Sequence, residues 1–182
     1  GVLRDPDGLR PDDVFTHEDL LAADPVDLAE AATVAQPEDL ATLIYTSGTT
    51  GPPKGVVITH QNVAWTIESL RRCIDFESYA GKRLVSYLPM AHIAERTVSH
   101  YSQVVLGYEV SCCPSPGEIA AYLGQVKPNV LFGVPRVWEK LKAGLEAAGI
   151  TDPAKLPEQA KAAVRARTGL DQTGWRITAA AP

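Results

Sequence analysis

The sequence predicts an α/β protein with a mostly parallel sheet and alternating helices on both of its faces. Short apolar runs that end near glycine or proline alternate about five times with segments of helical periodicity. This rhythm is typical of parallel sheets, because each parallel connection needs a crossover that covers one face of the sheet. The length of 182 residues is sufficient for one such core.

Individual elements follow from local patterns. Residues 1–36 are acidic and interrupted by proline, so we expect a peripheral segment there, with one short helix starting at the capping box of Thr16 and Asp19. An α/β subdomain is expected over 37–182. It opens with an apolar run at 40–45, which predicts a buried strand that leads into a glycine-rich loop. The later elements expected are strands within 82–90, 108–114, 128–135 and 175–182, and helices within 56–74, 92–107, 117–127, 136–149 and 157–168.

Composition narrows the class of protein. The 17 Lys and Arg residues are outnumbered by 22 Asp and Glu, and the net charge of −5 argues against a broad nucleic-acid surface. No apolar run approaches the ~20 residues that span a bilayer, although peripheral membrane contact stays open. The N-terminal stretch has no apolar core of a signal peptide, and the three cysteines lack paired spacing. We therefore expect a cytoplasmic protein.

The segment YTSGTTGPPKGV at 45–56 has the composition of a phosphate-binding loop. Its glycines let backbone N–H groups approach a ligand, hydroxyl groups add donors, and Lys54 adds a positive charge. The residues that offer these groups are Thr46, Ser47, Gly48, Thr49, Thr50, Gly51 and Lys54. It is not a Walker A loop, because Lys54 precedes the last glycine. Composition alone also fits a solvated loop or a hairpin turn.

Four loop segments follow predicted strands, at 46–55, 88–92, 133–136 and 179–182. In parallel sheets, ligands bind outside the carboxyl ends of the strands. We therefore expect the four segments to meet along one edge.

Several motifs resemble those of one enzyme superfamily. Residues 46–55 match the signature T-S-G-T-T-G-x-P-K-G at every specified position, and YLPMAHIAER at 87–96 matches a second motif around His92. VKPNVLFGVPRVWEKL at 126–141 is similar to a segment of long-chain members, and WRITAAAP resembles a further element, with Ala179 in place of the usual glycine. The chain thus resembles the adenylate-forming superfamily over 37–182, most of all a bacterial long-chain fatty acid–CoA ligase.

The resemblance implies an ATP-dependent acid–thiol ligase that uses Mg²⁺ and coenzyme A. A carboxylate attacks the α-phosphorus of ATP to give an acyl-adenylate and pyrophosphate, and the CoA thiol then displaces AMP. Ser47 to Gly51 and Lys54 are expected at the β- and γ-phosphates, and Thr46 near Mg²⁺. Lys54 and His92 are the expected catalytic residues, with His92 orienting the carboxylate. The implied acyl pocket comprises Met90, His92, Val134 and Pro135, and the implied adenine border comprises Ala180, Ala181 and Pro182.

Simpler interpretations of these residues remain. His92 also fits a polar residue at a helix start, and the turn of Val134, Pro135 and Arg136 also fits an ordinary strand-to-helix connection. The superfamily's Mg²⁺-binding glutamate, its ribose-binding aspartate and its small C-terminal domain are not found in the sequence. We therefore expect a central fragment of the N-terminal domain, inactive by itself, whose partners are fatty acid, ATP, CoA and the rest of its parent chain.

Two alternatives to a long-chain ligase stay open. One is an adenylate-forming ligase for an aryl, medium-chain or amino acid. The other is a nucleotide-binding fragment without catalysis.

Overall fold

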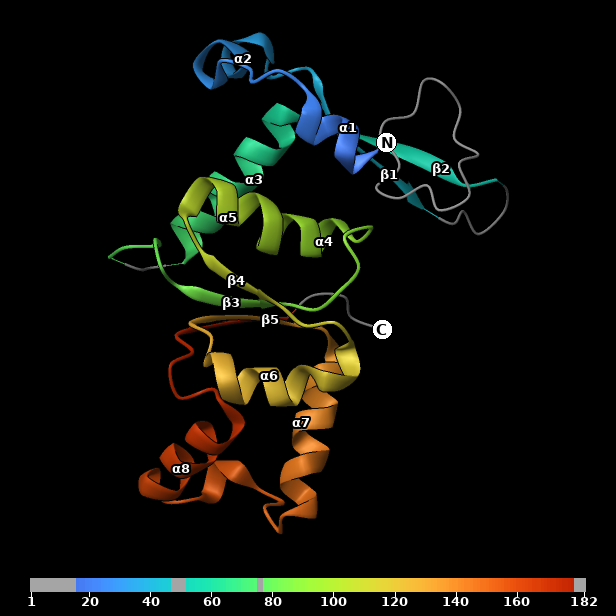
Figure 1. Cartoon of the computed structure of the whole chain (residues 1–182). Helices are drawn as coiled ribbons and strands as arrows, with labels where there is room; N and C mark the ends of the chain where they lie inside the picture. Colours follow the sequence, from blue (N-terminus) through green and yellow to red (C-terminus); the bar gives the residue numbers. More distant parts are fainter. Residues whose placement is uncertain (1–15, 47–51, 75–76, 179–182) are drawn as a thin grey trace. The chain divides into compact units, whose positions relative to one another are not determined.

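A computed structural model describes residues 16–46, 52–74 and 77–178 (Figure 1). The chain divides after Pro37 into two units. In the first unit, α1 (His17–Ala22) begins at the capping box that the sequence indicates: Thr16 Oγ1 accepts from the N–H of Asp19, whose carboxylate accepts from the N–H of Thr16. A second helix, α2 (Leu28–Val34), was not predicted. Neither helix has a buried residue.

The second unit contains a four-stranded parallel sheet, which confirms the predicted α/β fold. The strand order is β4-β3-β5-β6, and every pairing in this sheet is parallel. The strands are β3 (Arg83–Ser86), β4 (Glu109–Cys112), β5 (Val130–Gly133) and β6 (Trp175–Thr178).

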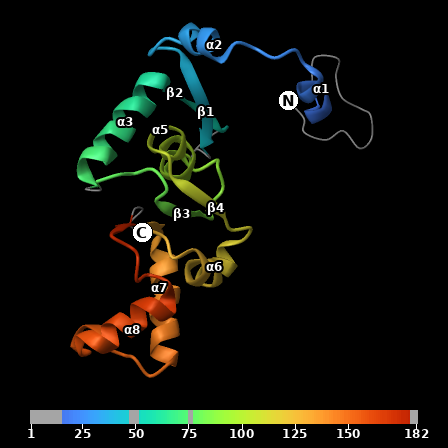
Figure 2. The ribbon, with the colours of Figure 1, turned by 60° about the vertical axis from the view of Figure 1, so that its left-hand side comes forward.

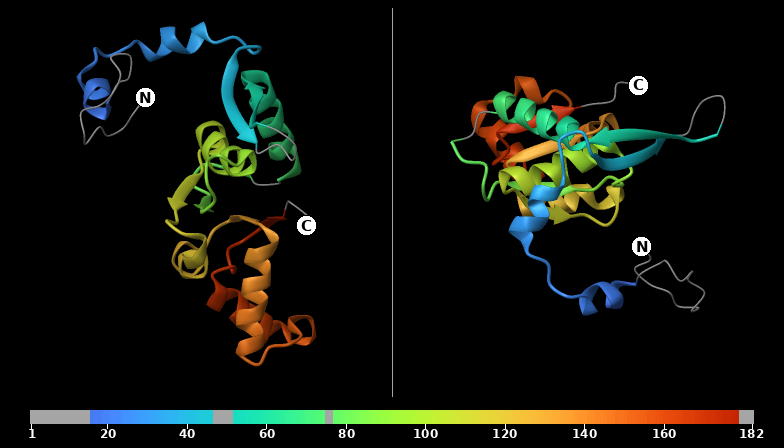
Figure 3. Two further views of the ribbon diagram at one scale, coloured as in Figure 1. Left: turned by 90° about the vertical axis from the view of Figure 1, so that its right-hand side faces the viewer. Right: turned by 90° about the horizontal axis from the view of Figure 1, so that it is seen from above.

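Helices cover both faces of this sheet (Figures 1 and 3). The connection from β3 to β4 lies on one face and comprises α4 (Ile93–Glu95), a π-helix η1 (Arg96–Tyr101) and α5 (Ser102–Leu106). The other face carries α6 (Ile119–Val126) and α7 (Pro135–Ala147), and α8 (Glu158–Thr168) packs on α6. The 3₁₀ turns η2 (Pro116–Glu118) and η3 (Pro153–Lys155) precede α6 and α8.

Alternation along the central strands divides the core into two clusters. Leu84 and Phe132 pack with Val98 of the π-helix, whereas Val85 and Leu131 pack with Ile119 and other residues on the opposite face. This period of two is what a strand buried on both faces requires. The sheet is thus a rigid base for the loops at its ends.

The structure places the first predicted strand outside the parallel sheet. β1 (Leu40–Thr46) pairs antiparallel with β2 (Lys54–Thr59) and does not belong to the parallel sheet. The prediction of a buried strand was wrong, since Ile44 is the only buried residue of β1. α3 (His60–Cys73) begins directly after β2 and packs beside both strands (Figure 2). The hairpin stays exposed because one helix can cover only one of its faces.

Among the described residues, no helix combines the length and the apolar character needed to cross a bilayer.

Candidate active site at the carboxyl edge of the sheet

The topology singles out one point at the carboxyl edge. From β3 the chain turns toward β4 on one side, and from β5 it turns toward β6 on the other. Such a point, where connections leave adjacent strands in opposite directions, is where open α/β sheets bind ligands. The loop at 88–92 leaves β3 here, and the turn at 133–136 leaves β5. These two of the four predicted segments therefore lie on adjacent strands.

Tyr87 ties the two strand ends together. Its hydroxyl donates to the carbonyl of Phe132 at 3.0 Å and accepts from the N–H of Val134 at 3.1 Å. Burial raises the pKa of this phenol above its ordinary value of 10.0; the bond from Val134 opposes the rise, and the nearby Glu95 carboxylate adds to it. Tyr87 was not predicted as a site residue, although an aromatic hydroxyl between a buried strand and Leu-Pro was a usable signal.

Met90 and His92 project from the loop after β3. Both are exposed. The carbonyl of Met90 accepts from Arg96 Nε at 3.0 Å, and the His92 N–H donates to the carbonyl of Pro89 at 2.9 Å. His92 is the N-cap residue of α4, yet its side chain makes no capping hydrogen bond. Hydrogen bonds hold the backbone at Met90 and His92, while the imidazole of His92 is exposed. This arrangement suits a residue that contacts a ligand.

Met90 also lines a cleft of about 310 Å³ at the carboxyl ends of β3 and β4, together with Tyr87 and Cys112. Met90 is therefore part of the lining of a hollow at the carboxyl edge.

Val134 and Pro135 form the start of α7, next to Tyr87. Val134 is the N-cap residue and Pro135 opens the helix, while the Arg136 side chain is exposed. The preceding Gly133 allows the Trp138 indole to approach the backbone, since a Cβ on residue 133 would lie 2.5 Å from the indole ring. Trp138 Nε1 also donates to the Gly133 carbonyl at 2.9 Å. The contacts of the Trp138 side chain with Gly133 hold the turn that leads into α7.

The hairpin brings Thr46 and Lys54 together. They are cross-strand partners at the end of the β1–β2 ladder, and both are exposed. One step inward, Tyr45 pairs with Gly55, and the tyrosine ring lies over the glycine, 3.5 Å from where a Cβ would stand. Directly opposed residues have Cβ atoms ~5 Å apart, so the Thr46 hydroxyl and the stem of Lys54 flank the same loop.

Arg96 connects the hairpin to the carboxyl edge. Besides its bond to Met90, its Nη1 donates to Thr42 Oγ1 of β1. Its neighbour Glu95 is buried and accepts from Ser99 Oγ at 2.6 Å. Tyr87 and Arg96 thus link the turn after β5 and the loop after β3, and Arg96 connects that loop to β1 at Thr42. The segment 46–55 does not follow a strand of the parallel sheet, contrary to the prediction of one shared edge.

Part of the predicted site lies outside the described residues: Ser47, Gly48, Thr49, Thr50, Gly51, Ala180, Ala181 and Pro182. Within the described ranges, no three His, Cys, Asp or Glu side chains are grouped to hold a metal ion. The predicted contact with Mg²⁺ involves Thr46, which is among the described residues.

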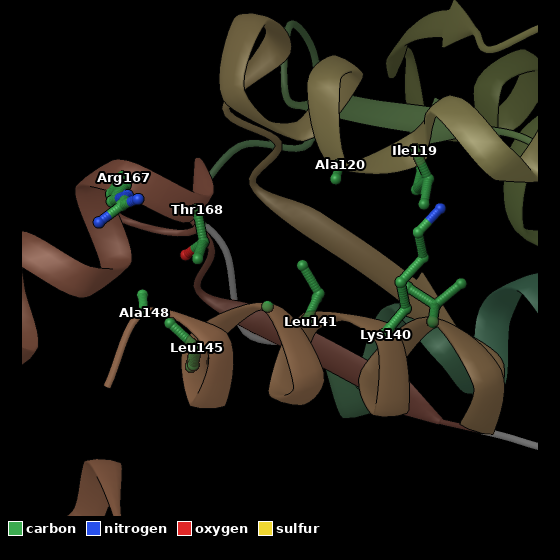
Figure 4. Close-up of a pocket in the computed structure, with 10 residues that line it drawn as sticks. Ile119, Ala120, Lys140, Leu141, Leu145, Ala148, Arg167 and Thr168 are labelled. Atoms are coloured by element: carbon green, nitrogen blue, oxygen red, sulfur yellow. The ribbon is translucent and has the colours of Figure 1, made fainter. Parts of the chain in front are cut away.

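A second hollow lies away from this edge. An apolar groove of about 290 Å³ runs between α6, α7 and α8, with Leu141 and Leu145 on its α7 side (Figure 4). None of the predicted site residues that the structure describes lines it.

The model of a family described as AMP-binding enzyme matches residues 4–181. The chain belongs to the AMP-binding, adenylate-forming family. The match includes most of the N-terminal segment, which carries none of the motifs quoted above.

Curated relatives are fatty-acid–CoA ligases. A putative fatty-acid–CoA ligase of Mycobacterium tuberculosis, fadD11, is 45% identical over 127 residues, which cover 70% of this chain and 22% of the relative. A long-chain-fatty-acid–CoA ligase of Xenopus laevis, ACSBG2, is 38% identical over 123 residues, covering 63% and 16%. This chain therefore spans about a fifth of the length of these relatives.

Solved structures show the same fold. The inhibitor-bound N-terminal domain of FACL13 from Mycobacterium tuberculosis has a TM-score of 0.62 and 25% identity, covering 91% of this chain and 36% of that one. o-Succinylbenzoate CoA synthetase of Bacillus subtilis, solved with ATP and magnesium, has a TM-score of 0.53 and 25% identity, covering 60% and 23%. Both agree with a partial N-terminal adenylate-forming domain.

Proposed function

We propose that this chain is the nucleotide-binding part of an ATP-dependent long-chain fatty acid–CoA ligase. The observation that carries the proposal is the pairing of Thr46 with Lys54 across the hairpin. It places a hydroxyl and an ammonium group at the two ends of one glycine- and threonine-rich loop, where both can face a polyphosphate. A fatty acid as substrate is supported by the relatives fadD11 and ACSBG2, and its long chain by ACSBG2.

The residues present fit Mg-ATP. Mg²⁺ is usually held by one or two protein oxygens together with substrate phosphates, so a single hydroxyl such as that of Thr46 is a suitable protein contribution. When bound, the ion neutralises charge on the phosphate oxygens. Lys54 does the same from the other strand, and its ammonium group stabilises the charge that develops as pyrophosphate leaves.

His92 and the Tyr87 bridge act at the carboxyl edge. The exposed imidazole of His92 orients the fatty acid carboxylate for attack on the α-phosphorus. Tyr87 keeps the loop after β3 and the turn of Val134 and Pro135 at a fixed separation, so that both border the acyl group. In the second step, the thiol of CoA attacks the acyl carbonyl and AMP leaves.

The test is calorimetric titration of Mg-ATP into the wild-type chain, into Lys54→Ala and into Lys155→Ala. Lys155 is a matched control, because it is an exposed lysine on η3, where it pairs with Asp152. We expect binding that Lys54→Ala abolishes and Lys155→Ala leaves unchanged. Equal binding by all three proteins, or no binding by folded wild type, would contradict the proposal.

A further inference from the structure

In the described part of the chain, the hydrogen-bond partners of the Arg96 guanidinium are neutral groups. This half-buried guanidinium donates from Nε to the Met90 carbonyl at 3.0 Å and from Nη1 to the Thr42 hydroxyl. Among the described residues it forms no ion pair with a carboxylate. The adjacent Glu95 carboxylate is buried and bonded to Ser99. A partly desolvated guanidinium with spare N–H groups favours an oxyanion as its next partner.

The π-helix places two further donors beside Arg96. In a π-helix the backbone bonds run from i to i+5, so residues i+4 and i+5 flank residue i. His100 and Tyr101 hold these two positions relative to Arg96. In an α-helix with 3.6 residues per turn, residue i+5 would lie about 140° around the axis, and Tyr101 would face away. The local π geometry therefore gathers a guanidinium, an imidazole and a phenol on one side.

The same three side chains line a cavity of about 390 Å³. Ala41 of β1 and Met90 complete its wall, and no carboxylate of the described part of the chain lines it. His100 is exposed, and its ring lies 5.4 Å from that of Tyr101. The cavity thus joins three donors to a small apolar surface, as a site for a small organic anion does.

We propose that this cavity is a second anion site, which binds a carboxylate or phosphate group through Arg96, His100 and Tyr101. It is separate from the loop that is proposed to hold ATP. Ala41 and Thr42 lie four to five residues before Thr46 on β1, which at the rise of a strand is about 13–17 Å. The inference does not depend on the proposed ligase function.

The experiment is a chemical-shift titration of the whole chain with two separate probes, inorganic phosphate and octanoate. Arg96→Gln and His100→Ala test the site; His100→Ala removes an exposed side chain and is the safer variant for folding. Arg165→Ala, an exposed arginine of α8, controls for net charge. We expect Arg96→Gln to weaken binding by about tenfold or more, as for the loss of a charge-assisted hydrogen bond. His100→Ala should weaken it severalfold, and Arg165→Ala should not.

The two probes distinguish a phosphate ligand from a carboxylate ligand, and the Lys54→Ala variant distinguishes this site from the ATP loop. Binding of phosphate alone identifies a phosphate group, and binding of octanoate alone a carboxylate. Lys54→Ala should leave this binding intact even where it abolishes binding of Mg-ATP. The proposal is overturned if neither probe binds folded wild type, or if His100→Ala binds as wild type does. It is also overturned if Lys54→Ala removes the binding.

Discussion

The two edges of the parallel sheet differ in how their polar side chains are used. At the amino edge several of these groups bond the protein to itself. Asn129 Oδ1 accepts from the backbone N–H of Arg83 at 3.0 Å, and the Arg83 guanidinium donates to the carbonyl of Lys127 at 3.0 Å. Thr173 Oγ1 donates to the carbonyl of Pro128 at 2.7 Å. Buried ends of strands are thereby satisfied without water.

The carboxyl edge is arranged in the opposite way. The side chains of Met90 and His92 are exposed, and the described contacts there mainly fix the backbone, through Tyr87 and Arg96. One edge therefore stabilises the fold, while the other holds loops in place and leaves their side chains available. Loss of a side chain that bonds the amino edge should accordingly affect stability, and loss of an exposed side chain at the carboxyl edge should affect binding.

The largest effect is expected at Gly169, which follows α8. Its φ is +73°, and a Cβ there would stand 1.9 Å from the carbonyl oxygen of Leu123 in α6. Gly169→Ala combines overpacking with left-handed strain and should lower the free energy of unfolding by about 3–4 kcal/mol. Gly149→Ala is the control, since its φ is +81° but the space around it is open. It should cost only about 1 kcal/mol. Equal losses of the two variants in urea unfolding would contradict the close contact of Gly169 with α6.

The next-largest effect is expected from Asn129→Ala at the amino edge. His92→Ala is its comparison at the carboxyl edge. Removal of the Asn129 amide leaves the Arg83 N–H without its partner and should cost about 2 kcal/mol in urea unfolding. His92→Ala removes an exposed side chain without a capping bond, so stability should change by less than about 0.5 kcal/mol. A loss of stability in His92→Ala as large as that in Asn129→Ala would remove the distinction between the edges.

Local periodicity was sufficient to predict most of the parallel sheet. Strands β3 to β6 lie within the expected segments, and the α-helices between them do so to within one residue, because each buried strand ends near glycine or proline and most of the helices have an apolar stripe. Helix α5 ends at Gly107 with φ +76°, as expected of a helix that ends at glycine. The fold class was therefore accessible from the sequence.

Three features were not accessible, each for a physical reason. β2 runs into α3 without a turn residue between Thr59 and His60, so its strand pattern merged with the helical one. The antiparallel pairing of β1 is a tertiary choice that its apolar run does not encode. The π-helix at Arg96–Tyr101 is accompanied by a buried hydroxyl contact, in which Ser102 Oγ donates to the Thr97 carbonyl, and apolar periodicity does not encode such a contact. The motifs predicted four of the residues at the carboxyl edge, namely Met90, His92, Val134 and Pro135. They did not predict Tyr87 or the cavity at Arg96, which depend on tertiary contacts and on the π-helix.

A smaller difference at neutral pH is expected between two tyrosines, one at each edge. Tyr87 bonds two backbone groups at the carboxyl edge, whereas the hydroxyl of Tyr108, just before β4, is buried and has no hydrogen-bond partner among the described residues. Tyr87→Phe should therefore cost about 1 kcal/mol at pH 7, and Tyr108→Phe close to nothing.

Alkaline pH separates the two tyrosines further. Burial, with a smaller contribution from Tyr79, raises the pKa of Tyr108 to about 12 from an ordinary 10.0. Below pH 10 the phenol is protonated in both the folded and the unfolded chain, and its contribution to stability is complete. Between pH 10 and 12 the unfolded chain loses this proton while the folded chain keeps it, so the free energy of unfolding falls as pH rises. Tyr108→Phe removes this contribution, and its stability should decline less than that of wild type across the window when urea unfolding is repeated at each pH. Parallel declines of the two proteins would show that Tyr108 ionises alike in both states, and that its side chain is not sealed at the amino edge.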